Sequence, residues 1–355
     1  MTYKYNIENK FKREWQKKII DWYKINKRDL PWRKNINQNF YKIWISEVML
    51  QQTIVKTVVP YYEKFINKWP TLKSFFNASL DEILLHWEGL GYYQRARNLY
   101  KAKEYLKKNK ININSSDLKK IPGIGDYISC AISAILRNED CAVIDGNIKR
   151  ILRRVFNLNE NQKSFKKQIS YIAKELTPSS KNGLYCQSLM DFANLVCKAK
   201  KPLCDKCFFK KICKFDGKTE KKLERKAKIN KVGVGFFVSE KNYFLVQMSN
   251  KKLLQGLYSI PLSNFLVNEK TVKIETINKI VLDWMSLNKI NQEYKILGKV
   301  NHIFSHFHLN LFIVHIKLNR RVNFNGLEWV TEKNLELKPK STLMKKVKKI
   351  MICES

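Results

Sequence analysis

The sequence predicts a multidomain protein with a mainly α N-terminal region and an α+β C-terminal domain. Its 355 residues are enough for two domains with separate cores. Apolar residues recur at helical spacing through the first two hundred residues, whereas the alternation typical of strands begins at residue 232. A charged stretch poor in apolar residues separates the two patterns, as a linker does. We therefore predict domains at residues 1–217 and 232–355, joined by a linker at 218–231.

The composition indicates a folded protein with a polyanionic partner. Hydrophobic residues make up 44% of the chain and aromatic residues 12%, which argues against disorder. The net charge of +37 suits binding to nucleic acid, although codon bias in an AT-rich genome enriches lysine in the same way. No apolar run resembles a signal peptide or reaches the roughly 18 residues of a membrane span. We expect a cytoplasmic protein without a membrane segment.

The first two helices are predicted at residues 8–26 and 41–57. Glu47 lies in the second helix on a stripe of apolar residues, where burial keeps a carboxyl protonated above its usual pKa of about 4.3. A carboxyl of that kind suits a general acid near neutral pH. The alternative is that Glu47 escapes to the helix edge or pairs with an arginine such as Arg28.

Three side chains near helix ends are suited to contact DNA bases. Gln51 and Gln52 close the second helix, where they can reach a base edge or wedge into a stack. Tyr92 follows a Gly-Leu-Gly turn between two further helices, with two arginines shortly after it. Aromatic rings beside arginines suit stacking on an unpaired base. A purely structural turn with core tyrosines explains the same residues.

A glycine turn and a later aspartate form the most distinctive pattern. The turn at residues 121–125, IPGIG, is too tight for a helix, because Gly123 and Gly125 permit positive φ and proline lacks an amide proton. A helix follows from Tyr127, and its first amides can seat a phosphate. Asp145 then directly precedes another helix. It can act as the N-cap of that helix, as a fixed negative charge for a developing sugar cation, or as both.

Four of the eight cysteines cluster at the end of the first region. In a cytosolic protein such clustering favours a metal over disulfides. Four thiolates can close around an iron–sulfur cubane, whereas zinc ribbons usually show two separated Cys-x2-Cys pairs and only one is present here. We therefore favour an iron–sulfur cluster over zinc. The four cysteines are Cys197, Cys204, Cys207 and Cys213.

The C-terminal domain is predicted from strands at 232–247 and 307–318 and from helices at 271–287 and 341–352. Around the start of the second strand lies a group of polar residues that suggests metal or nucleophile chemistry. No matching carboxylate cluster accompanies it, so a binding or structural role is the alternative. The group comprises His302, Ser305, His306 and His308.

Six motifs occur in order along the chain: SEVMLQQT, GLGYYQRARN, IPGIG, VIDGNIKR, the four-cysteine spacing and FSHFHL. Together they resemble the A/G-specific adenine DNA glycosylases, the MutY family. The resemblance implies a helix-hairpin-helix glycosylase region in two lobes, a four-iron–four-sulfur loop and a Nudix-like C-terminal domain. It also implies a monomer of the bacterial cytoplasm that excises adenine mispaired with 8-oxoguanine or guanine in double-stranded DNA.

The resemblance gives the catalytic side chains their roles. Glu47 matches the acid that protonates the flipped adenine at N7 and later activates water. Asp145 matches the carboxylate that stabilises the oxocarbenium-like sugar, with Asn147 close by. Tyr127 occupies the position of the Schiff-base lysine of endonuclease III and assists catalysis in some family members. This difference implies base removal without an efficient lyase step.

Other matches concern the flipped base and the lesion. Gln52 and Tyr92 match residues that intercalate at the lesion, which base flipping requires because the duplex hides the glycosidic bond. Ser305 and His306 match the C-terminal contact to 8-oxoguanine. The adenine pocket is matched by Arg28, Leu30, Trp32 and Gln187.

The remaining DNA contacts lie in the helical region. Gly123 and Gly125 are expected to hold the backbone. Lys149 matches a lysine near the product sugar, and we assign it a DNA contact rather than a catalytic role. We assign Gln51 to the DNA interface beside Gln52.

Two departures from the family pattern concern the C-terminal domain. The usual Gly-Leu-Trp-Gly is replaced by residues 252–255, KLLQ, so lesion discrimination is expected to be altered. The spaced glutamates of the Nudix signature are missing, which implies binding rather than hydrolysis of nucleotides. The alternatives are an endonuclease III-like glycosylase for thymine mispairs or oxidised pyrimidines, and a non-catalytic DNA-binding protein with the cluster as a scaffold.

Overall fold

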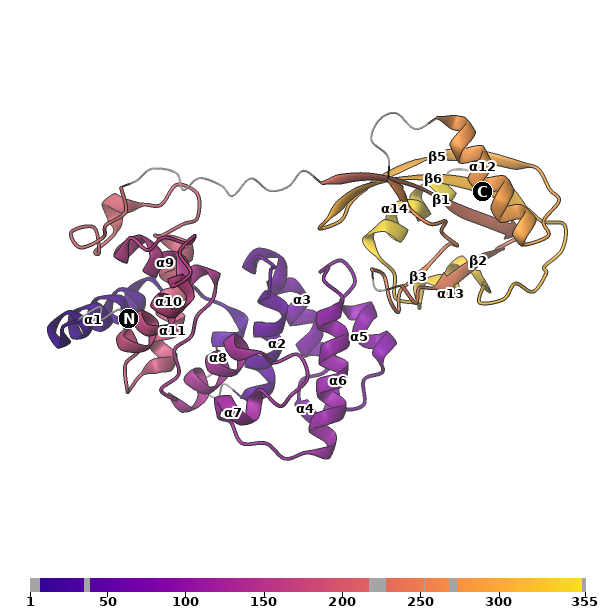
Figure 1. The fold of residues 1–355 in the computed structure, drawn as a ribbon. Helices are drawn as coiled ribbons and strands as arrows, with labels where there is room; N and C mark the ends of the chain where they lie inside the picture. The colour runs from indigo at the N-terminus through magenta and orange to yellow at the C-terminus, as the bar shows by residue number, and fades with distance from the viewer. Residues whose placement is uncertain (1–6, 35–38, 217–227, 252, 268–272, 353–355) are drawn as a thin grey trace. The chain divides into compact units, whose positions relative to one another are not determined.

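The chain divides by its contacts into two compact units, which are described separately. The computed structural model (Figure 1) describes residues 7–34, 39–216, 228–251, 253–267 and 273–352. Unit 1 comprises Met1–Asn77 with Asn98–Leu223, and unit 2 comprises Ala78–Arg97 with Glu224–Ser355. The segment Ala78–Arg97 therefore groups with the C-terminal residues, although sequence reasoning assigned it to the first domain. Most of the predicted linker lies outside the described residues, and the first strand begins at Ile229.

Unit 1 is helical, as predicted. α11 packs against α1, α8 and α9 (Figure 1), and their shared core includes Trp15 and Phe192. α6 (Gln94–Lys108) begins in unit 2 and continues into unit 1. The other helices are α1 (Asn9–Asn26), a 3-10 turn (Pro31–Arg33), α2 (Phe40–Leu50), α3 (Val55–Lys68), α4 (Leu72–Phe75), α7 (Ser115–Leu118), α8 (Asp126–Arg137), α9 (Gly146–Phe156), α10 (Phe165–Leu176), α11 (Asn182–Leu195) and a 3-10 turn (Cys204–Lys206).

The predicted helix at 41–57 is two helices, which corrects the sequence prediction. α2 ends at Leu50 and α3 begins at Val55. Between them Gln52 adopts φ +57°, a left-handed conformation that a right-handed helix cannot pass through. No glycine or proline marks this break, and the apolar periodicity continues across it. The sequence therefore predicted one helix instead of two.

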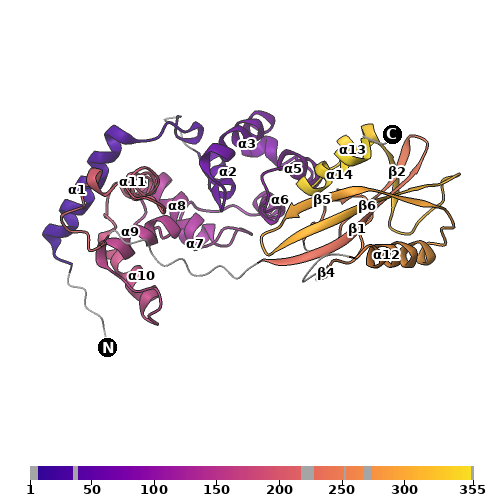
Figure 2. The same ribbon diagram turned by 90° about the horizontal axis from the view of Figure 1, so that it is seen from above.

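Unit 2 contains α5 (Leu80–His86) and one mixed sheet. The strand order is β3-β2-β1-β6-β5, with β4 also paired to β1 and β7 to β2. α12 lies on one face of the sheet, with α13 and α14 over the other (Figure 2). The bounds are β1 (Ile229–Glu240), β2 (Tyr243–Met248), β3 (Tyr258–Ser259), β4 (Leu266–Val267), α12 (Ile274–Leu287), β5 (Tyr294–Ile303), β6 (Phe307–Lys317), β7 (Glu328–Thr331), α13 (Glu332–Glu336) and α14 (Thr342–Ile352).

The alternation predicted for 232–247 is not the burial pattern of β1. Residues 232–240 are buried on both faces, because β1 is central and pairs in parallel with β6 while helices cover the sheet. Phe236, for example, stacks on Trp284 of α12 with ring centroids 4.1 Å apart. β5 was not predicted, because its many exposed and half-buried positions weaken the alternation. No helix among the described residues is long and apolar enough to cross a membrane.

Candidate active site

Glu47 is buried in α2 with 6% of its surface exposed, so the alternative that it escapes to the helix edge is wrong. Tyr127 of α8 donates a hydrogen bond from its hydroxyl to Glu47 Oε2 at 3.0 Å. Burial raises the pKa of Glu47 to about 7, although the Tyr127 hydrogen bond and the charge of Arg33 both act to lower it. A carboxyl with this pKa is partly protonated at neutral pH, which is the state a general acid needs.

Asp145 is the N-cap of α9. Its Oδ1 accepts hydrogen bonds from the backbone N–H groups of Asn147 at 2.9 Å and Ile148 at 2.7 Å. The Asn147 side-chain amide donates to Oδ2 at 2.8 Å. Both predicted roles are therefore compatible, since the helix cap holds the carboxylate in place. The charge of Asp145 also raises the pKa of Glu47, so the two carboxyls lie close enough to interact.

Arg150 connects this carboxylate to the chain that leads into the cysteine loop. Its Nη1 donates to Asn147 Oδ1 at 3.1 Å, and its Nε donates to the Cys197 carbonyl at 3.0 Å. A further bond from Nη2 reaches the Ala193 carbonyl at 3.0 Å. Arg150 is half-buried, and its guanidinium is directed at these backbone carbonyls.

The glycine turn precedes α8, as predicted. Gly123 has φ +83°, and a Cβ atom there would lie 2.6 Å from Asn98 Cβ, so both conformation and packing require glycine. Gly125 differs from the prediction, because it has φ −93° and acts as the N-cap of α8. It has no side chain to cap the first amides of α8, and both glycines are exposed. These amides are therefore open to a phosphate.

Asp191 is a site residue that sequence reasoning missed. It is completely buried on α11 and binds two arginines of the loop after α1. Arg28 donates from its backbone N–H at 3.0 Å and from Nε at 2.8 Å, and Arg33 donates from both terminal nitrogens at 2.8 and 3.1 Å. Burial opposes ionisation, but these arginines outweigh it and hold the pKa of Asp191 below its usual range. The only sequence signal was an acidic residue within an apolar helix.

Replacing Asp191 by asparagine is expected to destabilise unit 1 strongly. The change leaves two partly buried guanidinium groups without their counter-charge, and breaking such a pair from one side costs about 3–5 kcal/mol. Chemical denaturation of the two proteins measures the loss. The control is Asp21→Asn, which removes only an exposed pair with Lys24 and should leave the unfolding midpoint almost unchanged. Equal midpoints for Asp191→Asn and the wild type would contradict this assignment.

The other predicted adenine-pocket residues lie on the elements around this ion pair. Leu30 and Trp32 are buried at the Pro31–Arg33 turn, where Trp32 packs edge-on against Tyr62 with centroids 5.2 Å apart. Gln187 lies on α11, where its Oε1 is 3.5 Å from the Tyr23 hydroxyl and its Nε2 donates to the Gly183 carbonyl at 3.0 Å. The amide of Gln187 is thus held by its own helix.

The two residues predicted to intercalate share an uncommon backbone conformation. Gln52 has φ +57° and is exposed, and Tyr92 has φ +49° with 49% of its surface exposed. Positive φ is costly for residues other than glycine and concentrates at functional sites. Gln51 and Lys149 are half-buried, and their predicted DNA contacts stay predictions.

Ser305 and His306 occupy the exposed turn between β5 and β6. The strands pair up to Ile303 and His308, and the Phe304 amide donates to the Phe307 carbonyl at 2.9 Å. The hairpin therefore leaves both side chains exposed on a regular support, and the contact to the lesion that the family resemblance implies for them stays a prediction.

The four clustered cysteines are free thiols near one another. Burial and, after it, the charges of the other three sulfurs raise the pKa of Cys207 to about 11. The loop is anchored by Phe209, which is buried and stacks on Trp15 at 4.0 Å. No three His, Cys, Asp or Glu side chains in the described parts of the chain are spaced to hold one metal ion. The charges of the other three sulfurs act on Cys207, so the four thiols lie near one another, and four thiolates are the donor set that an iron–sulfur cluster uses.

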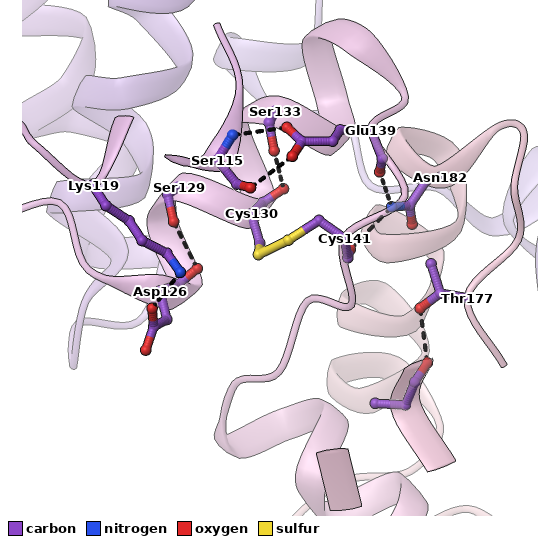
Figure 3. Close-up of a disulfide and its surroundings, with 11 residues drawn as sticks. Ser115, Lys119, Asp126, Ser129, Cys130, Ser133, Glu139, Cys141, Thr177 and Asn182 are labelled. Atoms are coloured by element: carbon purple, nitrogen blue, oxygen red, sulfur yellow. Dashed lines mark hydrogen bonds and ion pairs between the residues drawn. A yellow bond between two sulfur atoms is a disulfide. The ribbon is translucent and has the colours of Figure 1, made fainter. Parts of the chain in front are cut away.

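A disulfide joins Cys130 of α8 to Cys141, with Cα atoms 5.5 Å apart (Figure 3). This pair was not predicted, because the expectation of a metal concerned only the four clustered cysteines. Asn182 donates from its side chain to the carbonyls of Glu139 and Cys141, as Figure 3 shows. The segment that leads into Asp145 is therefore tied to both α8 and α11.

Comparisons with known proteins match both regions of the chain. Residues 45–179 match the family described as HhH-GPD superfamily base excision DNA repair protein, and residues 233–349 match the NUDIX domain. An adenine DNA glycosylase of Buchnera aphidicola subsp. Schizaphis graminum is 35% identical over 322 residues, covering 87% of this chain and 89% of that protein. The human adenine DNA glycosylase is 36% identical over 208 residues, covering 55% of this chain and 38% of the human protein.

A solved structure resembles the helical region. A thermostable thymine-DNA glycosylase superposes with a TM-score of 0.53 at 27% sequence identity. The match covers 59% of this chain and 98% of that protein. It confirms the predicted helical glycosylase fold, while the NUDIX match confirms the predicted Nudix-like C-terminal domain.

Proposed function

This chain belongs to the adenine DNA glycosylase family, as 35% identity over 87% of its length shows, and we propose that it removes adenine mispaired with 8-oxoguanine or guanine from double-stranded DNA. The observation that carries the proposal is the buried Glu47, with a pKa of about 7, beside Asp145. One carboxyl can donate a proton while the other stabilises positive charge, which is the division of roles in glycosidic hydrolysis.

The mechanism starts with an adenine flipped out of the duplex. Glu47 protonates the base at N7, and the bond between N9 and the sugar C1′ breaks, with its electron pair leaving on the base. The carboxylate of Asp145 stabilises the resulting oxocarbenium-like sugar. Glu47, now ionised, takes a proton from water as that water adds to C1′. The products are free adenine and an abasic site.

We propose that the chain is monofunctional and acts as a monomer in the bacterial cytoplasm. Tyr127 supplies a hydroxyl to Glu47 rather than an amine that could form a Schiff base. Gln52 and Tyr92 enter the base stack, and Arg28, Leu30, Trp32 and Gln187 surround the flipped adenine.

The exposed Ser305 and His306 are proposed to contact 8-oxoguanine. Gly123, Gly125 and Lys149 are proposed to hold the DNA backbone, with Gln51 beside the lesion. The C-terminal domain would then bind the lesion without hydrolysing a nucleotide. Lys252 of the altered KLLQ segment lies outside the described residues.

A second candidate is excision of thymine from mispairs, which the structural likeness to a thymine-DNA glycosylase favours. Duplexes containing adenine opposite 8-oxoguanine, thymine opposite guanine, and thymine glycol separate the classes. We expect strand breaks only in the adenine duplex, and only after alkali opens the abasic site. Cleavage of a thymine duplex, or nicking before alkali, would favour the endonuclease III-like alternatives.

We propose that Cys197, Cys204, Cys207 and Cys213 hold a four-iron–four-sulfur cluster. Such a cluster would organise the loop that carries these cysteines against α9. Arg154 of α9 already contacts this loop, since its Nη1 lies 3.4 Å from Cys197 Sγ and donates to the Lys198 carbonyl at 2.8 Å. Elemental analysis of protein purified without oxygen is expected to give about four irons and four sulfides per chain. One zinc per chain would contradict this proposal.

Base release is expected to weaken as pH rises through about 7. Glu47 has a raised pKa, so its protonated, proton-donating form predominates below this pH. Above it, the protonated fraction of Glu47 falls about tenfold per pH unit. Tyr127→Phe removes a hydrogen bond that lowers this pKa, and should shift the falling limb to higher pH. Single-turnover rates across pH test both expectations. A limb centred at the usual glutamate value of about 4.3 would exclude the buried acid.

A further inference from the structure

Glu88 connects the turn that presents Tyr92 to the C-terminal residues of unit 2. Its side chain is only 12% exposed. Oε1 accepts a hydrogen bond from the Lys340 backbone N–H at 2.9 Å, and Oε2 lies 2.7 Å from Lys345 Nζ. The Lys340 ammonium is also 3.8 Å from Oε1. The Glu88 carboxylate thus binds two lysines around the start of α14. Glu88 directly precedes Gly89, so these contacts hold the start of the turn.

Lys340 is itself fixed, so the contact is not between two mobile side chains. It is 3% exposed, and its Nζ donates to the carbonyls of Leu335 at 2.9 Å and Lys338 at 3.0 Å. The Tyr93 hydroxyl donates to the Lys340 carbonyl at 3.1 Å. A buried charge of this kind needs a counter-charge, which Glu88 and Glu336 supply.

The interior of the turn is equally well held. The Gly91 carbonyl accepts from Trp87 Nε1 at 3.0 Å and from Arg95 Nη2 at 3.1 Å. The Arg95 guanidinium also lies 5.5 Å from the centroid of the Tyr92 ring. The backbone of Tyr92 is therefore fixed in its left-handed conformation while its ring stays about half exposed.

We propose that Glu88 is a positioning residue that fixes the Tyr92 turn within unit 2, the unit that also contains the Ser305 and His306 hairpin. Insertion of the Tyr92 ring then depends on how the C-terminal domain has bound the base opposite adenine. Along the chain, this turn is followed directly by α6. This inference rests on the proposed function for its substrate.

The test compares Glu88→Ala and Glu88→Gln with the wild type. Glutamine keeps an oxygen that can accept from the Lys340 N–H but loses the charge facing Lys345. The matched control is Asp81→Ala, which removes an exposed carboxylate from the same segment. Two quantities are measured: amide hydrogen exchange at residues 89–93, and the ratio of single-turnover adenine release opposite 8-oxoguanine to that opposite guanine.

Glu88→Ala is expected to speed exchange at residues 89–93 and to lower the ratio about tenfold, within the usual range of coupling between sites. Glu88→Gln should fall between alanine and wild type, and Asp81→Ala should match wild type. Unchanged exchange in the central strands β1 and β6 shows that unit 2 stays folded. Faster exchange with an unchanged ratio would reduce Glu88 to a structural contact, and unchanged exchange would overturn the inference. If wild type releases no adenine from either duplex, the proposed function fails, while the exchange measurement still decides whether Glu88 holds the turn.

Discussion

Replacing Glu47 by glutamine is expected to lower adenine release by at least about 10³-fold while the protein still binds the mispaired duplex. General acid catalysis by a positioned side chain contributes up to about 10⁴-fold, and the proposed mechanism also assigns the activation of water to this carboxyl. Glutamine has nearly the same size and can keep the Tyr127 hydrogen bond through its carbonyl oxygen. It cannot transfer a proton to the base. Single-turnover release of adenine, with binding measured separately, quantifies the loss.

Glu63→Gln is the matched control for this experiment. Glu63 lies exposed on α3, and the same substitution there should leave both release and binding unchanged. If Glu47→Gln retained more than about a tenth of wild-type release, a role as general acid would be untenable. That outcome would support the alternative that the chain binds DNA without needing this carboxyl.

Asp145→Asn is expected to lower adenine release by about 10²–10³-fold without loss of fold. Removing one preorganised group that stabilises transition-state charge costs about this much. Asparagine is as good an N-cap as aspartate, so α9 should keep its start at Gly146. The change therefore removes the negative charge that we propose stabilises the sugar, while it preserves the helix. Single-turnover kinetics together with the thermal unfolding midpoint separate these two effects.

Asp126→Asn provides the comparison for this second variant. Asp126 begins α8, where its exposed side chain pairs with Lys119. Its neutralisation should leave the rate of base release close to wild type. Near-normal release by Asp145→Asn would mean that the helix cap, and not the charge, is the function of Asp145.

Much of the helical unit follows from local sequence patterns. Apolar spacing placed Glu47 among apolar neighbours, and its burial in the structure decides against the alternative position at the helix edge. An aspartate directly before Gly-Asn-Ile predicted the N-cap of α9. The IPGIG turn predicted a chain reversal, because positive φ at Gly123 is accessible mainly to glycine. Each of these features depends on neighbours within one helical turn.

The remaining features depend on contacts between distant parts of the chain. Asp191 meets Arg28 and Arg33 across more than 150 residues, and an acidic residue in an apolar helix does not specify such partners. The segment Ala78–Arg97 groups with the C-terminal residues through contacts such as that between Glu88 and Lys340, which are 252 residues apart. The break at Gln52 lacks the usual signals, since neither glycine nor proline occurs there.

The most direct test of this account measures free adenine released from a duplex with a single adenine opposite 8-oxoguanine, under single-turnover conditions at neutral pH. We predict that the wild-type protein releases adenine stoichiometrically and leaves an abasic strand that breaks only in alkali. Glu47→Gln should bind the same duplex and retain the base. Binding by the wild type without adenine release, or equal release by Glu47→Gln, would contradict the assignment of Glu47 as the acid of an adenine glycosylase.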